Sequence, residues 1–260
     1  MIDYSFSYDE LEYFLLILVR ITSFIHVAPF FGMNNTPRRV KISLGFFIAV
    51  LLYHMTMPHT PLVYHTVWGY GVLVMKEAVT GLLIGFGANI CTTVVTFSGM
   101  IIDMNIGLSM VSMMDPTTKQ NSSITGMYLQ YTTMLMLLVS GMYQFLLMAF
   151  VDAYRLIPIN GTVFRTDSLL ASMTQFLSEY IIIGFRICLP VFAVIMILNA
   201  VLGILAKVAP QMNMFSVGIQ FKILVGLMVL FFTTAMLPGA ADFIFRQMRI
   251  MVTRIVEGLL

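Results

Sequence analysis

Long apolar stretches without Asp, Glu, Lys or Arg alternate with short polar segments along this chain. A helix of about 20 apolar residues is long enough to span a bilayer, so these stretches predict membrane-class helices. Glu12 and Arg20 interrupt the first stretch, and Pro58 and Pro61 divide the second into a helix and a loop. Polar residues 103–123 and 152–179 are expected to be connecting loops, the second with a turn at 158–161 (Pro-Ile-Asn-Gly). The six stretches are 11–31, 42–75, 78–102, 124–151, 187–206 and 223–241.

The composition indicates that much of this chain is surrounded by lipid or by other apolar protein. Hydrophobic residues make up 59% of the 260 residues and charged residues 10%, against roughly 25% charged in soluble domains. A soluble globule needs polar groups to face water, so a soluble enzyme is excluded. The net charge of +2 gives no field for binding nucleic acid. Cys91 and Cys188 lie in apolar stretches and are expected to be small buried hydrophobes.

The distribution of Lys and Arg leads to a conflict about topology. The positive-inside rule places three segments in the cytoplasm: the basic residues 37–41, the loop 207–222 and the tail after residue 241. Only the apolar stretch 223–241 separates the last two segments, so they cannot both be cytoplasmic if it spans once. Either this stretch is re-entrant, with a break at Pro238 and Gly239, or the chain is not a series of simple spans.

Several residues within the apolar stretches suggest packing against protein rather than lipid. A charge exposed to lipid is costly, so such charges are expected to pair or to face protein or water. Four charges lie in or beside the apolar stretches and are predicted to be buried charges of this kind: Arg20, Lys76, Glu77 and Arg186. Gly81 and Gly85 form a G-x-x-x-G pattern, which lets another helix approach closely.

The segment 99–126 combines glycines, acids and methionines between two apolar stretches. Such a segment is ordinarily a solvated connector. The alternative is that it lines or blocks a water-filled path, because irregular backbone at membrane depth is tolerated only there. Methionine side chains suit adaptable surfaces, although they also serve as ordinary apolar filler. The residues singled out are Gly99, Asp103, Gly107, Met110, Met113, Met114, Asp115 and Pro116.

No catalytic or metal-binding motif is recognisable. The chain has no Walker lysine and no H-E-x-x-H motif, and the glycines of 85–90 lack the third glycine of a dinucleotide turn. Ser216 lacks the first glycine of a nucleophile elbow. His54, His59 and His65 have no carboxylate or cysteine nearby in sequence, which favours an extramembrane loop over a metal site. We expect no enzymatic activity, no cofactor and no bound metal.

Ordered motifs over nearly the whole chain identify a family. The most specific is 209–218 (Ala-Pro-Gln-Met-Asn-Met-Phe-Ser-Val-Gly), preceded by Lys207, where the family pattern has Arg. The others are Arg20, 29–32 (Pro-Phe-Phe-Gly), 37–41 (Pro-Arg-Arg-Val-Lys), Glu77, Gly81, Gly85, Gly99, Asp103, Gly107 and 115–116 (Asp-Pro). In this order they resemble the FliR family, export-apparatus subunits of type III secretion in flagella and injectisomes. The residues at 156–161 (Leu-Ile-Pro-Ile-Asn-Gly) and at 210–215 (Pro-Gln-Met-Asn-Met-Phe) resemble the flagellar branch of the family and favour it over the injectisome branch.

The resemblance implies an all-α membrane protein within a hetero-oligomeric helical cone. Family members build the channel for unfolded export substrates with FliP and FliQ, on top of FlhB and FlhA components. Residues 1–179 would be FliP-like, and 180–260 would be a FliQ-like hairpin with a basic C-terminal helix and no independent soluble domain. The family's pore plug would fall in 99–126. The hairpin tip that meets partners would include Lys207, Pro210, Gln211, Asn213, Phe215 and Lys222.

On this basis we expect a core subunit of the flagellar export gate, in the bacterial inner membrane within the basal body. Helices packed on partner helices outside the bilayer plane would explain the topology conflict. Two other interpretations stay open. A multi-span transporter or channel for small solutes would show inverted repeats, which are missing here. A scaffold that conducts nothing shares every sequence feature, so only conductance or secretion assays separate it from a gate.

Overall fold

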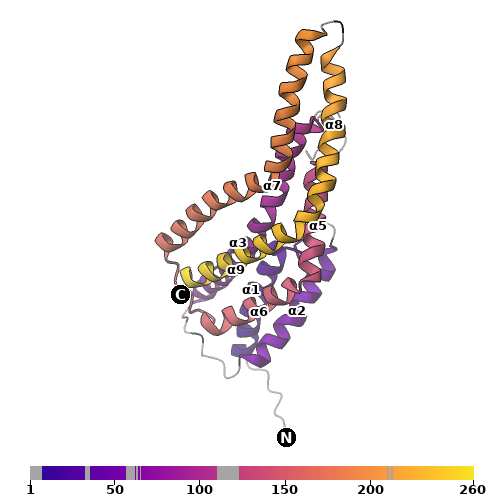
Figure 1. Cartoon of the computed structure of the whole chain (residues 1–260). Helices are drawn as coiled ribbons and strands as arrows, with labels where there is room; N and C mark the ends of the chain where they lie inside the picture. Colours follow the sequence, from indigo (N-terminus) through magenta and orange to yellow (C-terminus); the bar gives the residue numbers. More distant parts are fainter. Residues whose placement is uncertain are drawn as a thin grey trace. The chain divides into compact units, whose positions relative to one another are not determined.

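The computed structural model describes residues 8–32, 36–56, 62, 64, 66–109, 123–209, 211 and 213–260 (Figure 1). Every regular element among them is helical, which confirms the expected all-α class. The elements are α1 (Tyr8–Val27), α2 (Arg38–Met55), α3 (Val67–Ile106), α5 (Ile124–Val139), α6 (Met142–Leu156), α7 (Thr166–Val208), α8 (Met214–Thr233), the 3-10 turn η1 (Thr234–Met236) and α9 (Leu237–Gly258).

Three helical segments are long and apolar enough to cross a membrane: Val67–Ile106, Thr166–Val208 and Ser216–Gly258. A fourth span is possible if α5 and α6 count as one broken helix. The break falls at Ser140 and Gly141, and Gly141 has a φ of +69°, a left-handed conformation that glycine adopts without steric cost. The expected membrane-class helices are therefore present, and one of them is interrupted.

Two expectations about individual segments need correction. The loop expected at 152–179 is confirmed only for residues 157–165, because α6 continues to Leu156 and α7 begins at Thr166. Apolar residues 169, 173, 176 and 180 follow helical spacing, although polar neighbours conceal it. The helix break expected at Pro238 and Gly239 falls instead at η1, Thr234–Met236, and the re-entrant alternative for 223–241 stays a prediction. The chain is helical from Met214 to Gly258 apart from the short turn η1, and Pro238 lies in the first turn of α9, where proline is tolerated.

The chain forms two compact units, and α3, α7 and α9 each continue from one unit into the other. Unit 1 comprises Met1–Ile90, Gly141–Phe176 and Arg246–Leu260, and unit 2 comprises Cys91–Ser140 and Leu177–Phe245. This division follows contacts in space. The FliP-like and FliQ-like portions expected at 1–179 and 180–260 concern resemblance and stay a prediction.

The core of unit 1 forms around α1. Its buried side chains recur every three or four residues, as on one face of an amphipathic helix: Tyr13, Leu16, Ile17, Arg20, Ile21, Phe24 and Ile25. The ring of Phe24 stacks on Phe150 of α6 with a centroid distance of 4.2 Å. The chain end joins this core, because Val163 donates a backbone hydrogen bond to Leu259. This core holds α1, α3 and α6 close to one another.

Unit 2 has a smaller buried core and a long exposed hairpin. The buried side chains come from α3, α5, α7 and the first part of α9, and include Ile102, Leu129, Leu137, Ile183, Val191, Ile195 and Ile244. The hairpin of α7 and α8 extends beyond this core (Figure 1). Its apolar side chains are mostly uncovered, and Val208 and Phe231 are 75% and 76% exposed. Such a surface needs lipid or partner helices to cover it.

Candidate functional site

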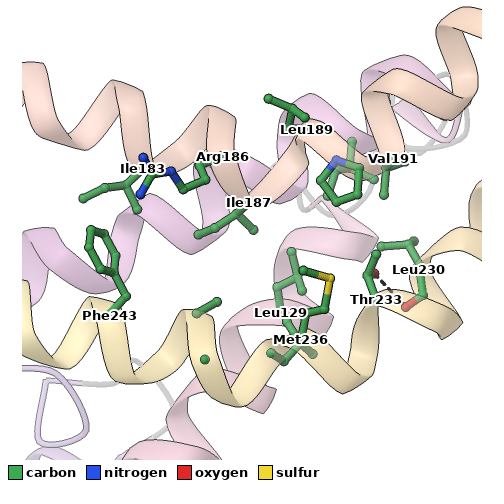
Figure 2. Close-up of a pocket in the computed structure, with 15 residues that line it drawn as sticks. Leu129, Ile183, Arg186, Ile187, Leu189, Val191, Leu230, Thr233, Met236 and Phe243 are labelled. Carbon is green, nitrogen blue, oxygen red and sulfur yellow. Dashed lines mark hydrogen bonds between the residues drawn. The ribbon is translucent and has the colours of Figure 1, made fainter.

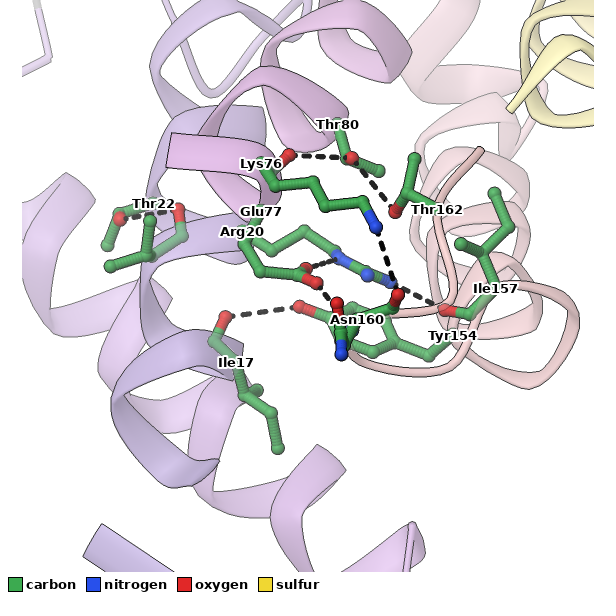
Figure 3. A network of polar contacts seen from close by, with 11 residues as sticks. Ile17, Arg20, Thr22, Lys76, Glu77, Thr80, Tyr154, Ile157, Asn160 and Thr162 are labelled. Carbon is green, nitrogen blue, oxygen red and sulfur yellow. Dashed lines mark hydrogen bonds and ion pairs between the residues drawn. The ribbon is translucent and has the colours of Figure 1, made fainter. Parts of the chain in front are cut away.

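A buried ion pair between α1 and α3 lies at the centre of unit 1. The Nε of Arg20 donates to Glu77, and the two side chains are 0% and 1% exposed (Figure 3). Arg20 Nη1 also donates to the carbonyl of Ile157 at 2.8 Å, and Glu77 Oε1 accepts from the backbone N–H of Asn160 at 3.0 Å. The two opposite charges thus neutralise each other inside an apolar core, and each side chain also forms a hydrogen bond with one backbone group. Buried charges need both a counter-charge and hydrogen bonds of this kind.

A second layer of contacts surrounds this pair. The guanidinium carbon of Arg20 lies 4.6 Å from the ring centroid of Tyr154, which is a cation–π geometry. This contact compensates Arg20 Nη2, which has no hydrogen-bond partner among the described residues. Tyr154 donates its hydroxyl to the carbonyl of Ile17 at 3.1 Å. Lys76 is half-buried, and its Nζ donates to the carbonyl of Asn160 at 3.0 Å. We name Arg20, Glu77 and the turn 157–160 the clamp.

Gly81 and Gly85 allow α1 to approach α3 next to the clamp. A Cβ added at Gly81 would lie 2.1 Å from the carbonyl oxygen of Arg20, and one at Gly85 would lie 2.9 Å from that of Phe24. Both distances are shorter than a carbon can approach an oxygen. The G-x-x-x-G pattern therefore marks the crossing of α1 and α3, at the height where the ion pair forms.

Asp103 joins the last turns of α3 to the start of α5 in unit 2. Its carboxylate accepts hydrogen bonds from the Ser123 hydroxyl at 2.7 Å, from the Thr125 backbone N–H at 3.2 Å and from the Thr125 hydroxyl. Ser123 is also the N-cap of α5, and its Oγ accepts from the N–H of Gly126 at 2.8 Å. Asp103 is 3% exposed. We name Asp103, Ser123 and Thr125 the latch.

The backbones of α3 and α5 touch beside the latch. A Cβ added at Gly99 would lie 2.2 Å from the Cα of Gly126, so only glycine fits there. Gly107 follows α3 with a φ of +93°, the left-handed conformation that commonly ends a helix. The latch therefore fixes the residues on both sides of segment 110–122. The candidate residues Met110, Met113, Met114, Asp115 and Pro116 belong to that segment, which lies outside the described residues.

We expect Asp103→Ala to lower the free energy of unfolding by about 2–3 kcal/mol, because hydrogen bonds to a charged group are strong and their donors would be left buried. Equilibrium unfolding of the purified chain in mixed micelles measures this change. Asn105→Ala is the matched control, since among the described residues its amide donates within α3, to the carbonyl of Ile101. Equal losses in both variants would contradict the structural role of the latch.

The turn between α7 and α8 presents polar side chains to its surroundings. Lys207, Gln211 and Asn213 are exposed, and Lys222 is half-buried on α8. Asn213 is the N-cap of α8 and accepts from the N–H of Ser216 at 3.5 Å. Two further residues predicted for this tip, Pro210 and the side chain of Phe215, lie outside the described part. The structure shows that the side chains of Lys207, Gln211 and Asn213 are accessible, and their contact with a partner stays a prediction.

Arg186 borders an apolar pocket of about 590 Å³ in unit 2. At its rim, the guanidinium carbon of Arg186 on α7 lies 5.9 Å from the ring centroid of Phe243 on α9. Leu129, Ile187 and Met236 contribute apolar walls (Figure 2). Arg186, grouped above with the buried charges, is exposed because its side chain faces this opening. The described residues contain no group of three or more His, Cys, Asp or Glu able to hold a metal.

Sequence reasoning missed the partners of both polar centres. Arg20 and Glu77 are 57 residues apart, and the groups that complete their coordination are backbone atoms of Ile157 and Asn160, which no side-chain pattern reveals. The sequence did carry a signal for Ser123, because serine immediately before an apolar run is a common helix N-cap. That signal was hidden within the polar segment 103–123.

The comparison with known proteins assigns the chain to a family. The family model described as "Bacterial export proteins, family 1" matches residues 11–248. The chain is similar to the flagellar biosynthetic protein FliR of Bacillus subtilis (strain 168), with 29% identity over 226 residues, 85% of this chain and 86% of that protein. It is 26% identical to FliR of Escherichia coli (strain K12) over 228 residues, 87% and 84% of the two chains. For FliR of Aquifex aeolicus (strain VF5) the identity is 25% over 217 residues, 83% of each chain. With a match over nearly its whole length, the chain belongs to the FliR family of bacterial export proteins.

Proposed function

We propose that this chain is a membrane subunit of the flagellar protein export gate. The match of the export-family model to residues 11–248 carries this conclusion, together with relatives that are flagellar biosynthetic proteins. Three long apolar helices agree with a place in the membrane part of the flagellar apparatus. We assign the chain to the bacterial inner (cytoplasmic) membrane, within the flagellar basal body.

The finer proposal is that FliP-like and FliQ-like subunits complete a helical cone with this chain, above FlhB-like and FlhA-like components. The exposed apolar hairpin supports it, because helices of this length have little cover within one chain. Gly203 on α7 has no atom within 4 Å of an added Cβ, so a partner helix could approach its backbone closely. The exposed polar tip at Lys207, Gln211 and Asn213 would then face a further component.

We also propose that residues 99–126 carry the plug of the closed channel. The latch supports this assignment, because a plug must be held at both ends while the residues between them fill the pore. Asp103 bonds to Ser123 and Thr125 and provides such a base. Unfolded export substrates would pass where Met110, Met113 and Met114 close the path, and flexible thioether side chains can reseal around different chains.

Replacing Met110, Met113 and Met114 together with Ser should make the closed channel leak ions. Serine is shorter and polar, so water can enter a seal that methionine kept dry. Conductance of the purified complex in planar bilayers measures the leak. Met148→Ser is the control, because Met148 is an exposed methionine on α6, outside residues 99–126 of the sequence. Unchanged conductance in the triple variant would contradict the seal.

Deletion of the gene in the source bacterium tests the proposed function. We expect no flagellar filament, no motility and no filament protein in the medium, with the wild-type gene restoring all three. A small-solute transporter would give a different result: filaments of normal length and secretion at the wild-type level, together with a defect in uptake or efflux. That outcome would contradict the export function.

A further inference from the structure

A polar pocket of about 540 Å³ lies in unit 1, where the end of α1, the start of α2 and the middle of α3 meet. Its polar wall consists of hydrogen-bond donors, and no carboxylate of the described residues lines it. The donors are the side chains of Thr22, Ser23, His26, Thr36, Arg38 and Lys41. A pocket with several donors, two fixed positive charges and no acid is suited to an anion.

The positive charges of this pocket are not neutralised within the described part of the chain. Neither Arg38 nor Lys41 forms an ion pair there, and Lys41 donates its Nζ to the carbonyl of Gly32 at 3.0 Å. Helix α2 begins at Arg38 with no acidic residue in its first turn and no side-chain cap from Pro37. The positive end of the helix dipole therefore adds to the field of both side chains.

An apolar surface continues from the polar wall along two helices. Ile42 and Leu82 line the pocket and are 62% and 41% exposed. Phe46 on α2 and Phe86 on α3, each four residues further within its own helix, are also exposed, at 53% and 40%. A small soluble anion gains nothing from such a surface. A ligand with a phosphate at one end and hydrocarbon at the other would satisfy both parts of it.

We propose that this pocket binds an anionic phospholipid of the surrounding membrane. Arg38 and Lys41 contact the phosphate, and the hydroxyl of Ser23 donates to one of its oxygens, whereas Thr22 already donates its hydroxyl to the carbonyl of Leu18. The acyl chains lie over the exposed side chains of α2 and α3. The bound lipid would neutralise the start of α2 and cover apolar surface that the chain leaves open. This proposal does not rest on the proposed function.

Native mass spectrometry of the full-length chain in detergent tests the proposal, with phosphatidylglycerol as the probe and phosphatidylcholine of the same acyl chains as the comparison. We expect Arg38→Gln and Lys41→Gln each to weaken phosphatidylglycerol binding about fivefold, the contribution typical of one basic residue at an anionic surface. Lys41→Arg should retain binding. Arg39→Gln is the matched control, because Arg39 lies in the same helical turn, is exposed and does not line the pocket.

Three results would overturn the proposal. Equal loss in Arg39→Gln would show attraction by the general charge of this segment. Equal affinity for phosphatidylcholine would show that the phosphate charge is not recognised. Displacement of the lipid by glycerol 3-phosphate at equal concentration would show a site for a free anion. A circular dichroism spectrum at the wild-type level confirms that each variant is folded, so a loss of binding reports on the pocket itself.

Discussion

Arg20→Met should lower the free energy of unfolding by about 3–5 kcal/mol, the usual cost of removing one partner of a buried ion pair. The carboxylate of Glu77 would remain in the core without its counter-charge, and the carbonyl of Ile157 would lose its donor. The clamp joins α1, α3 and the turn after α6, so its loss should loosen unit 1 as a whole. Equilibrium unfolding in mixed micelles measures the change, and secretion of filament protein by a complemented deletion strain measures its consequence.

The exposed pair of Arg155 and Asp152 provides the control in the same unit. These side chains are 69% and 62% exposed, with 3.6 Å between Nη1 and Oδ1. Arg155→Gln should change the free energy of unfolding by less than about 1 kcal/mol, since surface ion pairs contribute little. The double variant Arg20→Met with Glu77→Met should recover part of the loss, because it leaves no unpaired charge. A small, equal effect at Arg20 and Arg155 would contradict the clamp.

Gly99→Ala should lower the free energy of unfolding by about 3 kcal/mol and abolish secretion, because the methyl group of alanine has no room beside the Cα of Gly126. The start of α5 would have to move away, and Ser123 and Thr125 would then lose contact with Asp103. Thermal unfolding of the purified chain and secretion in the complemented strain measure the two effects. The same substitution would therefore affect both the α3–α5 crossing and the base of the proposed plug.

Gly71→Ala in the same helix is the matched control for Gly99→Ala. A Cβ at Gly71 has no atom within 4 Å, and alanine loses less conformational entropy than glycine when a helix folds. This variant should therefore be stabilised by about 0.5–1 kcal/mol. A destabilisation of similar size at both positions would show that α3 tolerates no change for reasons other than the crossing at Gly126.

The apolar pattern predicted the helical class because membrane-class helices need long uncharged runs, which are visible in one dimension. It also marked Arg20 and Glu77, since charges in such runs are costly unless paired. It did not predict that they pair with each other, because contacts between residues 57 apart depend on how the helices pack. For Arg186 the same rule led to a wrong expectation. A charge beside an apolar stretch was predicted to be buried, whereas its side chain is exposed and faces an open pocket.

The polar residues at the start of α7 conceal the beginning of this helix in the sequence. Thr166, Asp167 and Ser168 suggested a loop, whereas polar residues of this kind also begin helices. The turn at Pro158–Gly161 was predicted correctly, because Asn160 takes a φ of +68° and Gly161 donates to the carbonyl of Pro158 at 2.9 Å. The sequence alone did not reveal that this turn supplies two backbone groups to the clamp and its surroundings.

The measurement that tests the central claim most directly is the native mass of the tagged chain, purified with and without co-expressed FliP-like and FliQ-like subunits. A subunit of an export gate needs partners to cover its apolar hairpin, so a defined hetero-oligomer should form only when all three are present. A stable, monodisperse assembly of this chain alone, unchanged by co-expression, would contradict the export-gate account and favour a transporter that folds as a discrete unit.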